Sequence, residues 1–421
     1  MGNTKTIKGK EKQLASNTFF LYIMTFSTQL LNVITVPYLT RVLGPTTYGR
    51  IGLAVAYMTY VQLILDFGFL LSATQKVAQN KTDTEFLSKL VSAVTAIKLV
   101  LSAVVAIVFL AFFSFEFIEK KDILFYFIYL LAYAINALIP DYYYRGIENM
   151  KKITVRTVFI KTVFAVLIFV FVKQESDFFF VPVSLLIGNG LALLISVFDL
   201  KKNYNLCFSK PEIASIIRLF GDSVPFFVSR ISATFYQALN VVILGQVYSN
   251  NPVVGYYTSS DKLISLVKSG SSPIADSLYP YMVQNRNFKL VKKMLTIIMP
   301  LITLGVIVVG IFAEQICILL FGAEYASAGN ILRLLLPIAW VILPSYVLSF
   351  PVLSPMGLSR YANLSNVFGM CIQLILLLML FAVEKLNVYT LCLITSITEV
   401  SVFFFRFFVV LKNQKLMKTP E

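Results

Sequence analysis

Long apolar runs, interrupted by short polar segments, set the pattern of this chain. A helix needs around 20 apolar residues to cross about 30 Å of hydrocarbon. Runs of that length predict twelve spans, at 17–39, 50–73, 90–113, 123–140, 154–172, 179–198, 219–244, 256–279, 294–313, 329–352, 362–383 and 389–411. The pattern therefore predicts an all-α integral membrane protein.

The order of the spans predicts two halves of similar build. The Tyr48-Gly49 pair before the second span and the Val254-Gly255 pair before the eighth are 206 residues apart, close to half the chain. Six spans in each half would then start on the same side of the membrane, as in parallel repeats. The chain is thus divided into a basic cytoplasmic arm (1–16), a first lobe of six helices (17–200), a cytoplasmic linker (201–218), a second lobe of six helices (219–411) and a cytoplasmic tail (412–421).

Three of these spans have special features. Spans 219–244 and 256–279 are polar enough that a hydropathy window alone could miss them. The tenth span carries Pro337, Pro344 and Pro351 at seven-residue intervals. Because each proline removes a backbone hydrogen bond, these positions favour a bend.

Composition and charge agree with a bilayer as the solvent. Of the 421 residues, 58% are hydrophobic and 14% are charged, against about 25% charged in a typical soluble protein. The chain has 36 Lys and Arg and a net charge of +15; with a cytoplasmic N-terminus, inside segments hold 22 of these basic residues and outside loops hold 5. This asymmetry predicts that both termini are cytoplasmic, and it explains much of the net charge without a nucleic-acid partner.

Several classes of enzyme are disfavoured by what the sequence lacks. It contains no His, so no imidazole can act as general base, proton relay or metal ligand. Its four Cys have no CxxC spacing, so neither a zinc site nor a disulfide framework is expected. A membrane glycosyltransferase or polymerase would need a base, or metal-binding carboxylates such as a DxD pair, and neither is found. We therefore expect a protein that is not an enzyme.

Charged residues within the predicted spans are the main candidates for function. A charge at mid-bilayer costs at least about 2.5–3.5 kcal/mol, so such groups should face a water-filled cavity enclosed by protein. Six of them lie near span ends, where a side chain can reach the interface: Arg50, Arg156, Asp222, Asp276, Arg333 and Arg406. Two polar stripes lie deeper, one formed by Arg230, Thr234 and Gln237 and the other by Asp261, Ser265, Lys268 and Ser272.

An excess of basic groups within the spans predicts a site for anions. The spans hold nine basic and five acidic residues, so pairing cannot neutralise them all. Phosphate is the anion that Arg and Lys bind best. The candidate ligands are Arg230, Lys268, Lys262, Lys98 and Lys161. The alternative for Lys268 is a structural ion pair with Asp261, about two turns away.

Asp66 is a candidate for ion coupling. It shares a stripe of the second span with Thr59 and Gln62. A buried carboxylate with a raised pKa can bind a proton, or it can coordinate sodium together with an oxygen such as that of Gln62. A salt bridge or a helix-end cap is the structural alternative.

Six stretches of the sequence carry a family likeness: LYIMTFSTQLLNVITVPYLTRVLGPTTYG, DFGFLLSATQKVAQNKTD, YRGIENMKK, SVPFFVSRIS, VGYYTSSDKLISLV and FGAEYASAG. In order and spacing they resemble the Wzx-type O-antigen and polysaccharide flippases of the multidrug/oligosaccharidyl-lipid/polysaccharide (MOP) exporter superfamily. The likeness extends over nearly the whole chain and is strongest in its first third.

This resemblance implies a V-shaped pair of six-helix lobes around a central cavity, in the bacterial cytoplasmic (inner) membrane. Such proteins move an undecaprenyl-diphosphate-linked oligosaccharide from the cytoplasmic to the outer leaflet by alternating access. The family's cationic cavity would be supplied here by Arg230, Lys262 and Lys268 in the second lobe. Gln75 stands where a basic residue is expected, and Lys76 is the substitute.

The resemblance also indicates what the protein works with. The substrate would be a lipid-linked oligosaccharide of an O-antigen, capsule or exopolysaccharide pathway, surrounded by membrane lipids. Polysaccharide polymerase and chain-length machinery are candidate partners, and no cofactor is implied beyond a proton or sodium gradient. A MATE-like multidrug antiporter of the same superfamily is the alternative function. Its common substrates are cations, which a positive cavity would repel, so the cavity charge favours the flippase.

Overall fold

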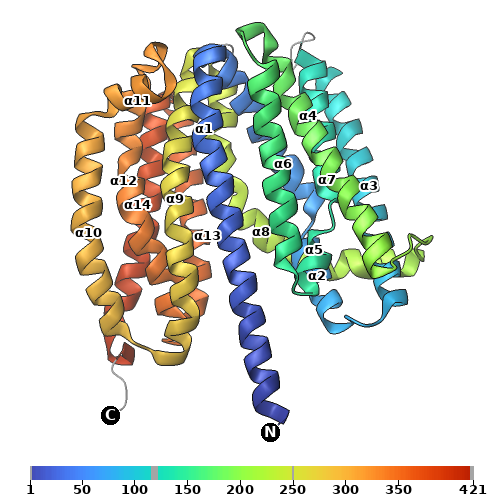
Figure 1. Ribbon diagram of the computed structural model, residues 1–421. Helices are drawn as coiled ribbons and strands as arrows, with labels where there is room; N and C mark the ends of the chain where they lie inside the picture. The colour runs from blue at the N-terminus through green and yellow to red at the C-terminus, as the bar shows by residue number, and fades with distance from the viewer. Residues whose placement is uncertain (1, 115–121, 249–250, 418–421) are drawn as a thin grey trace. The chain divides into compact units, whose positions relative to one another are not determined.

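The computed structural model describes residues 2–114, 122–248 and 251–417 (Figure 1). Within these ranges every regular element is a helix, as the apolar runs predict. Nine helices in the described part of the chain are long and apolar enough to cross a membrane. The protein is therefore an all-α, multi-pass membrane protein.

The helices of the first half are α1 (Gly2–Asp66), α2 (Phe69–Gln79), α3 (Thr84–Ser114), α4 (Ile123–Leu138), α5 (Asp141–Gly146), α6 (Met150–Phe171), η2 (Glu175–Phe179) and α7 (Phe180–Tyr204). Those of the second half are α8 (Ile213–Val247), α9 (Pro252–Asn285), α10 (Phe288–Ile311), α11 (Ala313–Phe321), η3 (Ala323–Tyr325), α12 (Ala328–Val347), η4 (Leu348–Val352), α13 (Ser359–Ala382), α14 (Val388–Lys412) and η5 (Gln414–Met417).

The nine apolar helices include ten of the predicted spans, because the helical stretch Ser16–Gln79 contains two of them. The other two predicted spans fall in α8 and α9, which have 35 and 34 residues. Within the described residues α9 has no apolar window and α8 has only the short stretch Ala238–Val247. Their polar character agrees with the sequence, whereas the count of twelve spans stays a prediction.

The chain forms two compact units. Unit 1 contains the chain up to Thr35 together with Ala54–Ile231, and unit 2 contains Val36–Leu53 together with the chain from Ser232 onward. The predicted lobes were 17–200 and 219–411, so two stretches are grouped differently. Part of α1 packs with unit 2, and the first half of α8 packs with unit 1.

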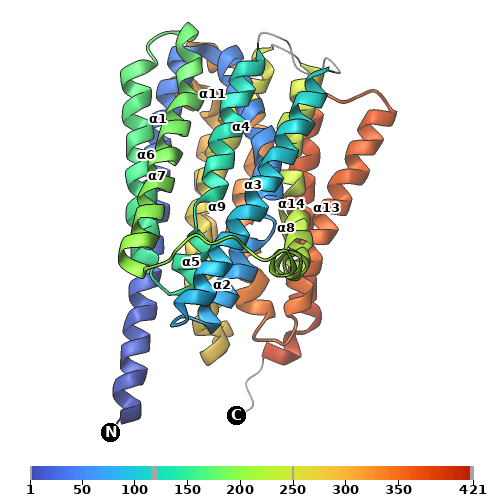
Figure 2. The ribbon, with the colours of Figure 1, turned by 90° about the vertical axis from the view of Figure 1, so that its right-hand side faces the viewer.

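Unit 1 has its core where α2 packs against α5. Phe69 and Val77 of α2 and Tyr142 and Tyr143 of α5 are buried there. Helix α7 packs against both α4 and α6. Figure 2 views the first turns of α8 end-on, so that this segment runs across the direction of α3 and α4.

Unit 2 is organised around α12, which packs against α9 and α14 (Figure 1). Most of α12 is buried. It ends in the π-helical turn η4, where Ser349 has non-helical dihedrals (φ −66°, ψ −123°). The bend that the three prolines predict in this span is therefore confirmed, and Pro351 lies within the π turn.

Two breaks interrupt the first long helical stretch. The first is at Gly44 (φ 69°, ψ 171°), between two helical segments of α1. The second is between α1 and α2, where Phe67 (φ 38°) and Gly68 (φ 75°) both have positive φ. This second break lies within the predicted span 50–73. Glycine fits at position 68 because of its positive φ and because a Cβ there would lie 2.9 Å from the backbone oxygen of Ser223 on α8.

Candidate functional site

The carboxylate of Asp66, at the end of α1, lies between two cationic side chains in unit 1. Its Oδ1 is 3.8 Å from Nζ of Lys98 on α3, and its Oδ2 is 3.7 Å from Nη2 of Arg230 on α8. Gln62 Nε2 donates a hydrogen bond of 3.0 Å to the same Oδ1. Lys98 is 4% exposed, and its amino group donates to the carbonyl oxygen of Ala137 at 2.5 Å.

The helix break next to Asp66 packs against α8 and so positions Asp66 relative to that helix. The ring of Phe67 stacks on Phe220 and Phe227 of α8, with centroid distances of 4.1 and 4.4 Å. One turn further along α2, Ser72 Oγ and Ser223 Oγ are 2.7 Å apart in a buried hydrogen bond. Since Arg230 follows Phe227 by three residues, the same face of α8 that holds the break also presents the guanidinium to Asp66.

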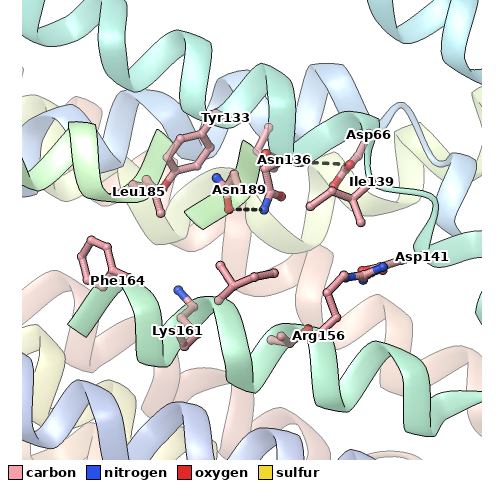
Figure 3. Close-up of a pocket in the computed structure, with 13 residues that line it drawn as sticks. Asp66, Tyr133, Asn136, Ile139, Asp141, Arg156, Lys161, Phe164, Leu185 and Asn189 are labelled. Carbon is pink, nitrogen blue, oxygen red and sulfur yellow. Dashed lines mark hydrogen bonds and ion pairs between the residues drawn. The ribbon is translucent and has the colours of Figure 1, made fainter. Parts of the chain in front are cut away.

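A cavity of about 310 Å³ adjoins this carboxylate. Its lining residues come from α1, α4, α5, α6 and α7 and include Gln62, Asp66, Tyr133, Asn136, Arg156, Lys161 and Asn189. Figure 3 shows Lys161 and Arg156 on α6 facing Asn189 and Asn136 across the cavity.

The polar groups of the cavity wall are tied to one another. Asn136 Nδ2 donates to Asn189 Oδ1 at 3.3 Å, and Asn189 Nδ2 donates to the backbone oxygen of Ala132 at 2.9 Å. Arg156 forms an ion pair with Asp141 and donates to Ser196 Oγ at 2.9 Å. These bonds fix α4, α6 and α7 around the cavity.

Positive charge exceeds negative charge when the two cations that contact Asp66 are counted with the cavity lining. The lining itself has two cationic side chains, Arg156 and Lys161, and two carboxylates, Asp66 and Asp141. Lys98 and Arg230 do not line the cavity but contact Asp66, and with them the group has a net charge of +2. Amide and hydroxyl groups complete the lining. The cationic side chains of this group can bind an anion such as a phosphate through charge-assisted hydrogen bonds.

The structure brings five of the predicted site residues together. Asp66 lies in contact with Gln62, Lys98 and Arg230, and Lys161 lines the same cavity. The salt bridge that was the structural alternative for Asp66 is observed. Arg230, which the sequence assigns to the second lobe, contacts Asp66 in unit 1 instead.

The predicted residues of α9 form a separate group in unit 2. Lys268 pairs with Glu399 of α14 at 2.8 Å, in place of the ion pair with Asp261 that was its alternative. Ser272 donates to Asp276 at 3.1 Å. Ser265 and Asp261 are half-buried and Lys262 is exposed. The side chains of Thr234 and Gln237 lie outside the described residues.

Two arginines expected at the interface are instead buried. Arg156 is 7% exposed and Arg406 is 5% exposed. The sequence places both near span ends, but Asp141, Ser196 and the polar groups of α12 and α13 hold the guanidinium groups inside. Lys76, the substitute for the basic residue expected at position 75, pairs with Asp222 at 2.7 Å.

Sequence reasoning missed several residues of the cavity wall, namely Tyr133, Asn136, Asp141 and Asn189. Asn136 and Asn189 are uncharged residues in otherwise apolar spans, so their amides were a signal that could have been used. Asp141 directly follows the predicted span 123–140, so the sequence places it in a loop.

Comparisons with known proteins show which family the chain belongs to. The family of polysaccharide biosynthesis proteins matches residues 14–286, which is more than half of the chain. A protein of Shigella dysenteriae named "Putative O-antigen transporter" is 23% identical over 86% of this chain and 91% of its own length. A protein of Escherichia coli strain K12 with the same name is 26% identical over 81% of this chain and 83% of its own length.

Solved structures share the fold. An inward-facing multidrug resistance MATE family transporter of the MOP superfamily aligns with a TM-score of 0.70 and 15% identity, covering 94% of this chain and 96% of that one. The lipid II flippase MurJ, in an inward closed conformation, aligns with a TM-score of 0.65 and 13% identity, covering 95% and 90%. The chain therefore has the fold of the MOP superfamily, and it belongs to the family of polysaccharide biosynthesis proteins.

Proposed function

We propose that this protein is a flippase for an undecaprenyl-diphosphate-linked oligosaccharide, the repeat unit of an O-antigen, capsule or exopolysaccharide. It moves this substrate from the cytoplasmic to the outer leaflet of a bacterial inner membrane by alternating access of two six-helix lobes. Twelve spans with both termini in the cytoplasm form this architecture. Transport is coupled to a proton or sodium gradient, and the protein is not an enzyme.

The observation that carries this proposal is the group of cationic side chains at the cavity of unit 1 and beside it. A diphosphate needs several positive donors: Lys161 lines the cavity, and Lys98 and Arg230, on two other helices, contact Asp66 of its lining. The amides of Asn136 and Asn189 supply donors and acceptors of the kind that sugar hydroxyls require. Lys268, in unit 2, is a second candidate ligand for phosphate.

Family membership supports the same conclusion. The relatives from Shigella dysenteriae and Escherichia coli carry O-antigen transport in their names, and O-antigen repeat units are glycans. A MATE-like antiporter shares the fold, but the net charge of +2 that the cavity lining has together with Lys98 and Arg230 disfavours cationic substrates. Polysaccharide polymerase and chain-length machinery are the proteins that would act on the exported glycan.

The test is translocation by the purified protein in liposomes of a defined diphosphate-linked oligosaccharide, with and without ion gradients. We expect Arg230→Ala combined with Lys268→Ala to lower the rate at least tenfold, because both proposed phosphate ligands are removed. The matched control is Arg286→Ala with Lys289→Ala, which removes one Arg and one Lys that are exposed. An unchanged rate in the first double variant would refute the cationic-cavity mechanism.

A further inference from the structure

We propose that Asp66 is an internal counter-ion, which the diphosphate of the substrate replaces on Lys98 and Arg230. The inference deepens the proposed function and rests on it, because the diphosphate is taken from there. It assigns Asp66 a role in setting the affinity for the substrate, in addition to any role in ion coupling.

The first support is the length of the two ion pairs of Asp66. Hydrogen-bonded pairs of an ammonium or guanidinium with a carboxylate have N–O distances of about 2.7–2.9 Å. The distances from Asp66 to Lys98 and Arg230 are 3.8 and 3.7 Å. Both separations are longer than this range, so an anion with more oxygens and more charge can bind the same two cations more closely.

Other ion pairs in unit 1 are shorter. Lys76 and Asp222 are 2.7 Å apart, and Lys152 and Asp199 are 2.5 Å apart. Within the described part of unit 1, the long N–O distances are therefore particular to the ion pairs of Asp66. The site also adjoins the cavity, and Figure 3 shows Asp66 at its edge. The cavity therefore reaches the carboxylate that contacts Lys98 and Arg230.

The second support is the position of Asp66 in the backbone. It is the last residue of α1, where the helix dipole places partial negative charge and disfavours a carboxylate. Phe67, the next residue, has a φ of 38°, which residues other than glycine rarely adopt. Lys98 and Arg230 therefore stabilise a carboxylate that its own helix end disfavours.

Exchange of counter-ions follows from these two features. While Asp66 bridges Lys98 and Arg230, the buried charge of Lys98 is compensated in the absence of substrate. A bound diphosphate would compensate the charges of Lys98 and Arg230 in place of Asp66. Asp66, and with it the helix break at Phe67 and Gly68, would then no longer be held by these two cations. Competition with Asp66 also keeps the affinity moderate, so that the substrate can leave on the other side.

The experiment measures binding of farnesyl diphosphate, a short prenyl diphosphate, to the purified full-length protein. Asp66→Asn and Asp66→Ser should each bind it about tenfold more tightly than the parent, because the competing carboxylate is gone. Asp66→Glu keeps the negative charge and should stay within about threefold of the parent. Asp222→Asn is the matched control, because it removes a carboxylate from an exposed ion pair of the same unit.

The outcomes separate this inference from the proposed function. Equal or weaker binding by both Asp66→Asn and Asp66→Ser, in protein that is monodisperse and melts cooperatively, would overturn the counter-ion role. Equally tightened binding by Asp222→Asn would overturn it too, since the effect would then be one of net charge. If the parent translocates no lipid-linked oligosaccharide while the Asp66 variants still bind farnesyl diphosphate more tightly, the proposed function fails and the counter-ion role stands.

Discussion

Lys268 Nζ lies 2.8 Å from Oε1 of Glu399, and this ion pair joins α9 to α14 in unit 2. Glu399 is 7% exposed, so its charge needs a partner. The sequence offers Asp261 to Lys268, but seven residues along a helix correspond to a rise of about 10 Å. A carboxylate on a neighbouring helix therefore lies closer to Lys268 than one two turns away on the same helix.

Lys268→Ala should lower the stability of unit 2, because it leaves the carboxylate of Glu399 buried without this partner. The expected loss is about 1–3 kcal/mol, below that of a fully buried pair because Lys268 is partly exposed. Thermal unfolding in detergent measures it. Adding Glu399→Gln should restore part of the melting temperature, and a double variant as unstable as the single one would contradict this account.

The same double variant separates two roles of Lys268. If Lys268 only holds α9 to α14, translocation in liposomes should recover together with stability. If it is also a phosphate ligand, as proposed, translocation should stay low while the melting temperature recovers. Measured separately, the melting temperature and the translocation rate therefore distinguish the two roles of Lys268.

Hydropathy predicted most of the apolar helices, and charge predicted several residues of the candidate site, because burying a charge in a membrane is costly enough to mark functional positions. Asp66, Lys98 and Arg230 stand out on that ground, and the structure brings all three together. Which charges meet could not be predicted, since Arg230 follows Asp66 at a long distance in the chain and the pairing depends on how α8 packs.

The helix break at Phe67 and Gly68 shows a second limit of the sequence. A single glycine in an apolar run is common in membrane helices, and nothing in the pattern marks the phenylalanine for a positive φ. At the break, the backbone of α8 occupies the space that a Cβ on Gly68 would need, so only glycine fits there. Local pattern cannot report a contact of that kind.

The two glycines that mark the predicted repeat meet in unit 2. A Cβ built on Gly49 would lie 2.7 Å from the backbone nitrogen of Gly255, and one built on Gly255 would overlap the carbonyl group of Pro45. Gly255→Ala should therefore force the second segment of α1 and α9 apart, at a cost of about 1–3 kcal/mol. Thermal unfolding and liposome translocation should both show a loss.

Gly270→Ala is the control for this prediction, because it lies on the same helix and a Cβ there meets no atom within 4 Å. Alanine is the better helix former, so we expect unchanged or slightly higher stability, by up to about 1 kcal/mol. If Gly255→Ala behaved in the same way, the close crossing of the two helices would not matter for folding or transport.

Asp66→Asn tests ion coupling as well as substrate affinity. If Asp66 carries the coupling ion, the residual translocation rate of this variant should not respond to a proton or a sodium gradient, because an amide neither titrates nor supplies a charge to sodium. Initial rates in liposomes, with each gradient imposed separately, measure this. Asp141→Asn, at the other carboxylate of the cavity wall, should retain the dependence, and a retained dependence in Asp66→Asn would assign coupling to another group.

Arg406 of α14 fixes three helices at the bend of α12. Its guanidinium donates to Ser345 Oγ on α12 at 2.9 Å, and to Ser365 Oγ and Asn366 Oδ1 on α13 at 2.8 Å each. Ser345 lies just before the π turn, so these bonds hold the end of α12 in place. A planar fork of donors can reach acceptors on both helices at once, whereas the single ammonium group of lysine cannot.

Arg406→Lys should therefore destabilise the protein by about 1–3 kcal/mol although the charge is kept, because buried acceptors on α12 or α13 lose their donor. Arg360→Lys, at an exposed position, makes the same exchange without that cost and should stay within about 0.5 kcal/mol of the parent. Thermal unfolding of the two variants side by side measures the difference. Similar melting temperatures would mean that α12 keeps its bend through its prolines and packing alone.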